Sequence, residues 1–329
     1  MRAIGYSAFG PAADVLQTVQ IQMPQPQPGE VRIALQYSGV NPSDAKARSG
    51  SRPGVTKPPF DLVIPHSDGS GVIDAVGAGV DAGRIGQRVW IWNGQWQRAF
   101  GTAAEAVCLP EDQAVPLPQS ISLEAGATLG IPGLTAAHAV FGGGDITGQT
   151  LLISGGAGAV GHSAVQLAKW GGARVIASCS PNAAARVAAA GADHVLDYSA
   201  PDLAARIMDL TGDQGGIDRA VEVEFGVNAA LLGEVTKPNG TIAAYGSQKD
   251  MAPALPFGPY LFKALTIDIV LIYILPKPER DAAIARLHAA LQDGALIPAI
   301  EHILPLEDAA RSHDLVMSPG RAGACLLKI

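Results

Sequence analysis

The sequence predicts a two-part α/β protein in which a β-rich segment precedes a doubly wound parallel sheet. Three observations carry this prediction. The chain has 329 residues, about two domains at roughly 150 residues each. Short β-branched and apolar segments between Gly and Pro turns fill residues 1–123. From residue 150 onward, buried-strand patterns alternate with helical patterns at the spacing of parallel strand–helix–strand units.

The composition indicates a globular protein with large apolar cores. Hydrophobic residues make up 48% of the chain and charged residues 16%, which is far from the composition of a disordered protein. The formal net charge is −7, whereas phosphate contacts with nucleic acids need clustered Lys and Arg. We therefore expect no nucleic-acid partner.

The sequence also predicts a protein outside membranes and in a reducing compartment. The longest strongly apolar run, Leu265–Leu275, contains Asp268 and is shorter than the roughly 20 residues that a helix needs to span a bilayer. Met1–Leu16 lacks the apolar core of a signal peptide. The three cysteines are widely separated and form no C-x-x-C pair. These features favour a cytoplasmic protein without a disulfide framework.

In the first part of the chain we expect short strands between turns. Val31–Tyr37 and Val72–Val76 are rich in β-branched and apolar residues, and several prolines before Gly29 break the segment that precedes them. A helix is predicted to begin near Ser122–Leu129, where the serine can cap it.

The second part of the chain is predicted to alternate strictly between strands and helices. The expected strands are Thr150–Ser154, Arg174–Ser178, His194–Leu196, Arg219–Val223 and Thr241–Tyr245. The expected helices are Val160–Trp170, Ala183–Ala190, Leu203–Leu210 and Ala229–Val235. After Pro276 a helix over 279–292, a strand, a helix over 306–317 and a last strand are expected. We expect these last elements to return to the first domain.

A phosphate-binding turn is the most informative motif. Residues Gly156–Gly161 form a G-x-G-x-x-G pattern that follows the apolar strand Leu151–Ile153 and opens the helix Ser163–Lys169. Glycine permits the tight turn, the approach of a pyrophosphate to bare backbone, and close packing of the helix on the sheet. Backbone N–H groups at the helix N-terminus then face the pyrophosphate. The motif predicts a dinucleotide site.

The end of the second strand favours NADPH over NADH. An NAD site usually carries Asp or Glu about 20 residues after the motif, to bind the ribose 2′-OH. Residues 177–182 contain no acid, so a 2′-phosphate is not repelled there. Ser180 and Arg186 are the candidate partners of the 2′-phosphate, and Tyr198 could close the pocket. An exposed helix position is the alternative interpretation of Arg186.

No metal site is predicted. Zinc requires several Cys, His or carboxylate ligands around one point. His66 is the one tempting residue, but it has no Cys partner near Val40–Asp44. We interpret His66 as a loop histidine near the cleft. The other histidines do not cluster in sequence.

Taken together, these residues resemble a known family. The matching segments follow one another along nearly the whole chain: Gly39–Asp44, Arg48–Gly50, Ser67–Asp68 with Gly71, Gly130–Ala137, Gly155–Gly161, Gly191–Asp193 and Asp197–Tyr198. The chain resembles the zinc-free quinone oxidoreductase (zeta-crystallin-like) branch of the medium-chain dehydrogenase/reductase superfamily. In this resemblance Ser67 and Asn41 fall where the alcohol dehydrogenases carry a zinc-ligand His and Cys.

The resemblance implies the fold and the outline of the site. It implies a GroES-like β domain from residues 1–123 and 270–329, and a Rossmann-type domain over 124–269. The nicotinamide would lie in the cleft between them. Asn41 and Thr135 would border the nicotinamide, and Leu265–Tyr273 would be the edge strand that pairs in a homodimer. The cofactor-binding residues that it implies are Gly158, Ala159, Val160, Gly161, Tyr245, Gly246 and Ser247.

Two positions depart from the family pattern. Some bacterial members carry a Lys for the 2′-phosphate where this chain has Ala183, which leaves Ser180 and Arg186 to bind that phosphate. A cleft Tyr of many members is Lys46 here. A Tyr can donate a proton or stack on a substrate ring, and Lys46 would act differently.

The expected activity is metal-free transfer of hydride from NADPH to a quinone, with Asn41, Lys46 and Thr135 as candidate donors to the acceptor oxygen. One alternative is an enone or enoyl-thioester reductase, for which a basic entrance could be supplied by Lys46, Arg48, Arg52 and Lys57. Another is a non-enzymatic NADPH-binding protein. Three tryptophans, Trp90, Trp92 and Trp96, could stack on a flat substrate, although packing in a β hairpin is the simpler interpretation.

Overall fold

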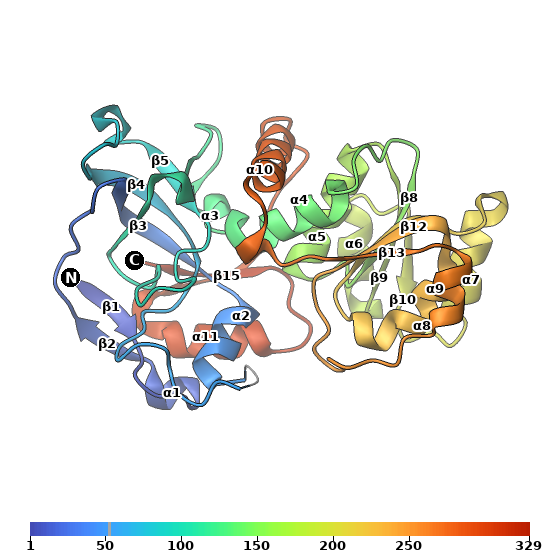
Figure 1. Ribbon diagram of the computed structural model, residues 1–329, viewed down its shortest axis with the longest axis horizontal. Helices are drawn as coiled ribbons and strands as arrows, with labels where there is room; N and C mark the ends of the chain where they lie inside the picture. The colour runs from blue at the N-terminus through green and yellow to red at the C-terminus, as the bar shows by residue number, and fades with distance from the viewer. Residues whose placement is uncertain (52–53) are drawn as a thin grey trace. The chain divides into compact units, whose positions relative to one another are not determined.

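The computed structural model describes residues 1–51 and 54–329 and has the expected α/β character (Figure 1). It forms two compact units, Met1–Ile131 with Pro298–Ile329, and Pro132–Ile297. The second unit therefore begins and ends later than the expected range of 124–269. The reason lies in α10 (Lys277–Gln292), which packs on α4 (Leu134–Phe141) of the second unit and buries Leu287 and Leu291.

The first unit is built on a mostly antiparallel sheet. Its strand order is β14-β15-β3-β4-β5-β7, with β6 paired to β3, and β1 pairs with β2 separately. The bounds are β1 Arg2–Gly5, β2 Gln17–Gln20, β3 Glu30–Val40, β4 Asp68–Val76, β5 Arg88–Ile91, β6 Ala106–Pro110, β7 Ala114–Pro116, β14 Ile300–Pro305 and β15 Ala324–Lys328. The long strand β3 pairs with β4, β6 and β15 and places Val31, Ile33 and Leu35 in the core.

The first unit contains α1 (Ala12–Val15), α2 (Pro42–Ser49) and α11 (Ala309–Met317), which pack on one another, and α3 (Leu123–Gly126), which contacts β3, β4 and β5. Helix α2 was not expected, yet its signals are local: Asn41 at the N-cap, Pro42 in the first turn, and Gly50 with a φ of 74° at the C-terminus. Helix α11 packs on α2, so residues from opposite ends of the chain meet there.

The second unit is a six-stranded sheet in which every pair of neighbouring strands is parallel, in the order β10-β9-β8-β11-β12-β13. The bounds are β8 Thr150–Ser154, β9 Arg174–Cys179, β10 His194–Asp197, β11 Ile217–Glu222, β12 Thr236–Ala244 and β13 Thr266–Ile269. Its remaining helices are α5 Ala159–Trp170, α6 Ala184–Ala189, α7 Leu203–Thr211, α8 Phe225–Val235 and α9 Phe257–Phe262. This strand order is that of the dinucleotide-binding fold, with its reversal between β8 and β11.

The core of the second unit explains why the chain forms these layers. Buried residues of successive strands, among them Leu152, Ile176 and Ile242, pack against Leu232 and Tyr260 of the helices α8 and α9. The expected strands and helices of this region are confirmed, with two differences. Helix α9 was not expected, and the edge strand β13 covers only Thr266–Ile269 of the expected range of 265–273.

Among the described helices, none combines the length and the apolar character that crossing a bilayer requires.

Candidate functional site

The turn between β8 and α5 has the geometry of a phosphate-binding loop. Gly155 has a φ of 66°, a backbone conformation that glycine adopts without strain. A Cβ atom on Gly161 would lie 2.2 Å from the carbonyl oxygen of Gly155. Because no side chain can occupy that space, glycine at 161 allows the first turn of α5 to lie directly against the loop.

The N-terminus of α5 is left open for an anion. Gly158 is the N-cap, and no side chain of the described residues caps the helix there. The first hydrogen bond of the helix runs from the amide of His162 to the carbonyl of Gly158, at 2.8 Å. The amides of Ala159, Val160 and Gly161 therefore have no acceptor within the helix. Backbone donors and the helix dipole make such an end a site for phosphate.

Arg186 brings a positive charge to the same loop. Its guanidinium, which comes from α6, donates a hydrogen bond of 2.5 Å to the carbonyl of Ala157. The pKa of His162 on α5 is lowered by burial and then by the charge of Arg186. Ser180 lies half-buried at the end of β9, at the N-cap of a short turn. The structure thus places the half-buried Arg186 against the loop and Ser180 at the end of the neighbouring strand β9. Their contacts with a 2′-phosphate stay predictions.

In the first unit, Asn41 is held by two buried carboxylates. Its backbone amide donates to Asp44 Oδ2 at 2.8 Å, and its side-chain Nδ2 donates to Asp68 Oδ2 at 2.8 Å. Asp68 Oδ1 accepts the backbone amide of Ile131, also at 2.8 Å. Asp68 is 1% exposed. Burial raises its pKa well above the ordinary range of an aspartate, although the bonds from Ile131 and Asn41 act in the opposite direction.

His66 belongs to a fully buried chain of hydrogen bonds. Its Nδ1 lies 2.8 Å from Ser38 Oγ, and its Nε2 lies 2.9 Å from Nε2 of His313 on α11. Ser38 Oγ lies 2.8 Å from Thr102 Oγ1, and the Thr102 hydroxyl donates to the carbonyl of Asp68. His66 is a loop residue, as expected, with a φ of 77°, and it is 0% exposed.

The donors fix the tautomers along this chain. Because Thr102 donates to Asp68, Ser38 must donate to Thr102 and accept from Nδ1–H of His66. Nε2 of His66 is then the acceptor and receives the Nε2–H of His313. Both rings are therefore neutral. Burial lowers the pKa of His66 well below the ordinary histidine value, and that of His313 to about 3, with the Arg48 guanidinium as the second cause for His313.

Comparisons with known proteins agree with this geometry. Residues 27–119 match the model of the alcohol dehydrogenase GroES-like domain, and residues 159–288 match that of the zinc-binding dehydrogenases. The chain is 30% identical to a chloroplast envelope quinone oxidoreductase homolog of Arabidopsis thaliana, over 94% of this chain and 92% of that protein. The chain belongs to the quinone oxidoreductase family of medium-chain dehydrogenases/reductases.

Other members of the quinone oxidoreductase family match over almost the full length. The quinone oxidoreductase of Rattus norvegicus is 28% identical, over 99% of this chain and 97% of its own. The structure of the Escherichia coli quinone oxidoreductase complexed with NADPH superposes with a TM-score of 0.87 at 25% identity, covering all of both chains. These matches confirm the resemblance and the fold class inferred from the sequence.

The other family positions lie on different elements. Thr135 is buried in the first turn of α4, and Lys46 is half-exposed on α2. Tyr198 follows β10 with 59% of its surface exposed. The amide of Tyr245 donates to the carbonyl of Glu222 at 3.0 Å, which fixes the segment 245–247 after β12. The hydroxyl of Ser247 accepts the amide of Gly226 at 2.8 Å, so it already holds this segment against α8. The cofactor contacts of these residues stay predictions.

The structure bears on two further expectations, the basic entrance and the tryptophan cluster. Arg48 is 6% exposed, and its guanidinium donates to the carbonyl of Gly10, so it does not lie at a basic entrance. Arg52 lies outside the described residues. Trp90 is 0% exposed and Trp92 5%, and Trp92 Nε1 donates to the carbonyl of Asp112 at 3.1 Å. These two tryptophans therefore pack in the first unit, as the simpler interpretation proposed.

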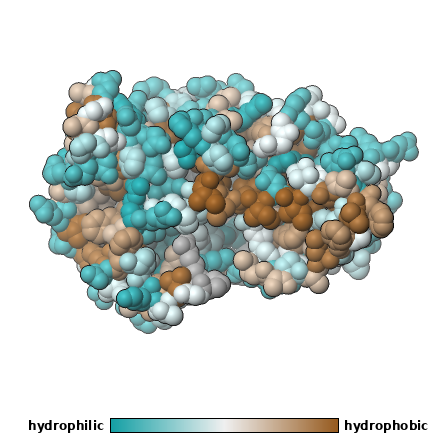
Figure 2. All heavy atoms as spheres, in the orientation of Figure 1, coloured by the Kyte–Doolittle hydropathy of each residue, from teal (hydrophilic) through white to brown (hydrophobic). Residues whose placement is uncertain are grey.

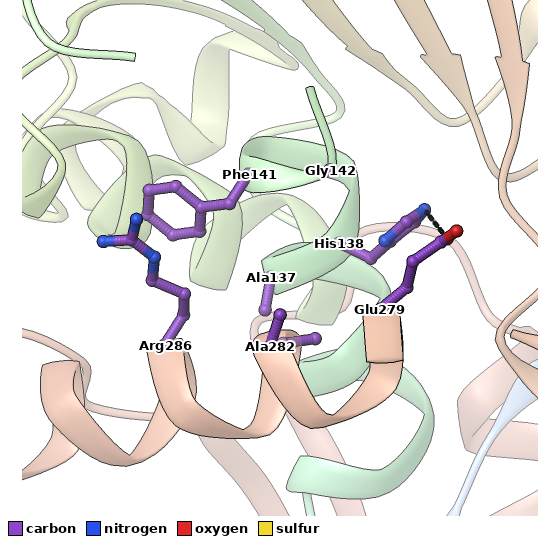
Figure 3. A pocket seen from close by; sticks show the side chains of 8 residues that line it. Ala137, His138, Phe141, Gly142, Glu279, Ala282 and Arg286 are labelled. Atoms are coloured by element: carbon purple, nitrogen blue, oxygen red, sulfur yellow. Dashed lines mark ion pairs between the residues drawn. The ribbon is translucent and has the colours of Figure 1, made fainter. Parts of the chain in front are cut away.

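Metal ligands and cavities do not add a further site. Within residues 1–51 and 54–329, no group of three or more His, Cys, Asp or Glu side chains is arranged to hold a metal ion. A cavity of about 170 Å³ lies between α4 and α10 and is lined by His138, Phe141, Glu279 and Arg286, among others (Figure 3). His138 Nε2 lies 3.8 Å from Glu279 Oε2. None of the predicted site residues lines this cavity.

The sequence reasoning missed Asp68 as the partner of Asn41, and His313 as the partner of His66. Asp68 was part of the matched segment Ser67–Asp68, but the sequence did not show that it pairs with Asn41. His313 lies 247 residues from His66 in the sequence, and no local pattern links the two.

We expect the histidine pair to make stability depend on pH. Because the folded state lowers the pKa of His313 to about 3, the unfolded state binds more protons below about pH 6.5, and stability falls as the pH falls. In a His313→Gln variant the amide can still donate to His66 but does not titrate. The slope of unfolding free energy against pH between 6 and 4 should then decrease by up to about 1.4 kcal/mol per pH unit.

Chemical unfolding at a series of pH values measures this slope. His302→Gln, at a half-exposed position on β14, is the matched control and should leave the slope nearly unchanged. An unchanged slope in His313→Gln would show that this histidine is not held neutral in the folded protein.

Proposed function

We propose that this chain is an NADPH-dependent oxidoreductase that reduces a quinone without a metal ion. The observation that carries the proposal is the position of Arg186, which hydrogen bonds to the phosphate loop at Ala157 beside the open N-terminus of α5. Membership of the quinone oxidoreductase family and the NADPH complex of its Escherichia coli relative support it.

The residues of the second unit fit the two phosphate groups of NADPH. The amides of Ala159, Val160 and Gly161 would hold the pyrophosphate, because they lack acceptors in the helix. Arg186 and Ser180 would hold the 2′-phosphate. A guanidinium binds phosphate through charge-assisted hydrogen bonds, and residues 177–182 carry no acid to repel it. Tyr198, with its exposed ring, can close over this end of the cofactor.

The first unit would contribute groups for the acceptor. Bound NADPH supplies a hydride. The quinone gains this hydride and one proton and becomes the hydroquinone, and the proton can come from water. Negative charge grows on the quinone oxygen during the transfer, and donors aimed at that oxygen lower the barrier. In the first unit Asn41 retains one N–H for this purpose, and Lys46 is a second candidate donor. The third candidate donor, Thr135, lies on α4 of the second unit.

The enone or enoyl-thioester alternative uses the same groups. In that reaction the hydride is added to the β-carbon of a C=C bond that is conjugated with the carbonyl. The structure removes part of the support for a nucleotide-phosphate entrance, since Arg48 is buried. Lys46 and the exposed Lys57 remain available. The quinone acceptor is therefore the first proposal, and a non-enzymatic NADPH-binding protein is the last.

We also propose a homodimer that forms through the β13 edge. β13 pairs with β12 on one side. Figure 2 shows apolar side chains gathered over β13 and α9. Among them Ile269 is 69% exposed, Ile274 65% and Phe262 88%. Exposed apolar surface next to an open strand edge is typical of an interface.

Steady-state oxidation of NADPH, and separately of NADH, with a panel of quinones and enones tests the function. We expect chelator-resistant turnover with quinones and a preference for NADPH. In Arg186→Ala the KM for NADPH should rise about 10- to 100-fold, because a hydrogen-bonded charge pair is lost, while the KM for NADH stays within about 2-fold. Arg206→Ala, at an exposed position on α7, is the control for removal of a positive charge.

Turnover with enones alone would support an enone or enoyl-thioester reductase. NADPH binding without turnover would support a non-enzymatic NADPH-binding protein. Equal use of NADH and NADPH by the wild-type protein would contradict the role given to Arg186.

The dimer is tested by sedimentation at micromolar concentration. Wild-type protein should sediment as a dimer, and Ile269→Arg as a monomer, because a charge would be buried in the interface. Ile297→Arg is the matched control, since Ile297 is also 69% exposed. A dimeric Ile269→Arg protein would place the interface elsewhere.

A further inference from the structure

We propose that Asp68 is a positioning residue that fixes which end of the Asn41 side-chain amide faces the substrate. The inference deepens the proposed function and rests on it, because Asn41 is there the donor to the acceptor oxygen. Asp68 acts through Asn41 and is not itself a group that contacts the substrate.

The geometry allows one orientation of the amide. A carboxylate only accepts hydrogen bonds, so the Nδ2 end of Asn41 must point toward Asp68 Oδ2, at 2.8 Å. The backbone amide of Asn41 is held separately by Asp44 at 2.8 Å. With both ends of the residue held, the second N–H of Nδ2 and the oxygen Oδ1 have set directions. An amide without these bonds could rotate, so that either its N–H or its oxygen would face the substrate.

Asp68 itself cannot turn away. Its Oδ1 accepts the backbone amide of Ile131 at 2.8 Å, and its carbonyl accepts the hydroxyl of Thr102. A Cβ atom on Gly130 would lie 2.1 Å from Oδ1, and one on Gly39 2.8 Å from the Asp68 Cβ. Glycine at these two positions lets backbone close in on the carboxylate, so the side chain is enclosed on several sides.

Packing alone does not call for a carboxylate at this position. Burial of a charge without a cationic partner is unfavourable, and the second carboxylate, Asp44, raises the pKa of Asp68 further. An asparagine has nearly the same shape and could still accept the Ile131 amide. What an asparagine cannot do is accept from Ile131 and from Asn41 through two separate oxygens. The Asn41 side chain also faces the backbone amide of Asp44 in a capping box, which favours the same orientation. Of the two contacts, only the one with residue 68 depends on an aspartate.

Asp68→Asn therefore keeps nearly the same side-chain shape at position 68 but changes the orientation of the Asn41 amide. The Ile131 donor is backbone and keeps the single oxygen of the new carboxamide. The new NH₂ group then faces Asn41, whose amide must rotate to offer its oxygen. The N–H that was aimed at the acceptor is replaced by an oxygen, which repels the developing negative charge.

The experiment compares wild type, Asp68→Asn, Asn41→Ala and the double variant by kcat and KM for NADPH and a quinone, with NADPH affinity and melting temperature measured in parallel. Removal of one such donor typically lowers kcat about 100- to 1,000-fold. We expect Asp68→Asn to lower kcat by about this factor and to leave the NADPH affinity within about 2-fold. In the Asn41→Ala background the same substitution should change kcat less than about 2-fold, because the group it positions is gone.

Asp218→Asn is the control for loss of a carboxylate that accepts a backbone amide, since the half-buried Asp218 accepts from Thr150 at 2.8 Å in the other unit, where it also pairs with Lys237. It should lower the melting temperature without a specific loss of kcat. An equal loss of kcat from Asp68→Asn in both backgrounds would overturn the proposal, as would an unchanged kcat in the folded single variant.

A readout without turnover separates this proposal from the proposed function. In ¹⁵N-labelled wild-type protein, one Nδ2 proton of Asn41, assigned by its loss in Asn41→Ala, should be shifted downfield by its bond to the carboxylate. Asp68→Asn should abolish that shift. If no acceptor turns over, the proposed function fails, while an unshifted proton in the wild type would refute the positioning role.

Discussion

A close backbone approach at the phosphate-binding turn sets the geometry of the proposed cofactor site. The first turn of α5 lies against the carbonyl of Gly155, at a distance that only glycine at 161 permits. This contact fixes the angle at which α5 leaves β8, and with it the direction of the open amides of residues 159–161. Arg186 bonds to the same loop, where we propose that it binds the 2′-phosphate. The strand reversal between β8 and β11 leaves room above the sheet for a ligand.

The first unit follows a different physical rule, in which buried polar groups are held by directed hydrogen bonds. Asp68 joins two such systems: its side chain binds Asn41 and Ile131, and its carbonyl ends the chain that begins at His313. A buried polar group is costly unless it is paired. The members of this chain bond to one another in one consistent donor direction, whereas the buried Nδ1 of His313 has no hydrogen-bond partner among the residues that the structure describes. The left-handed backbone at His66, a conformation that favours glycine, is strained for histidine and is offset by the two bonds of its ring.

The fold and the site could be predicted from the sequence where the signals are local. The phosphate loop, the alternation of strands and helices after residue 150, and the place of Arg186 beside that loop follow from spacing within one strand–helix unit. The sequence was insufficient where contacts are distant. Residues near His66 in the sequence give no sign of its contact with His313. The second unit extends to Ile297, beyond the expected 269, because α10 packs on α4. Helix α2 was missed although its caps were visible, because a helix of 8 residues has too few turns to show periodicity.

The central claim is that the α5 N-terminus and Arg186 form an NADPH site, and calorimetric titration of the wild-type and Gly161→Ala proteins with NADPH tests it most directly. The account predicts one site per chain in the wild-type protein, with tighter binding of NADPH than of NADH. In Gly161→Ala the added Cβ must displace the loop from the helix, so affinity for both cofactors should fall by about 100-fold or more, the factor that corresponds to roughly 3 kcal/mol. Unchanged affinity in a folded Gly161→Ala protein, or no binding by the wild type, would contradict the account.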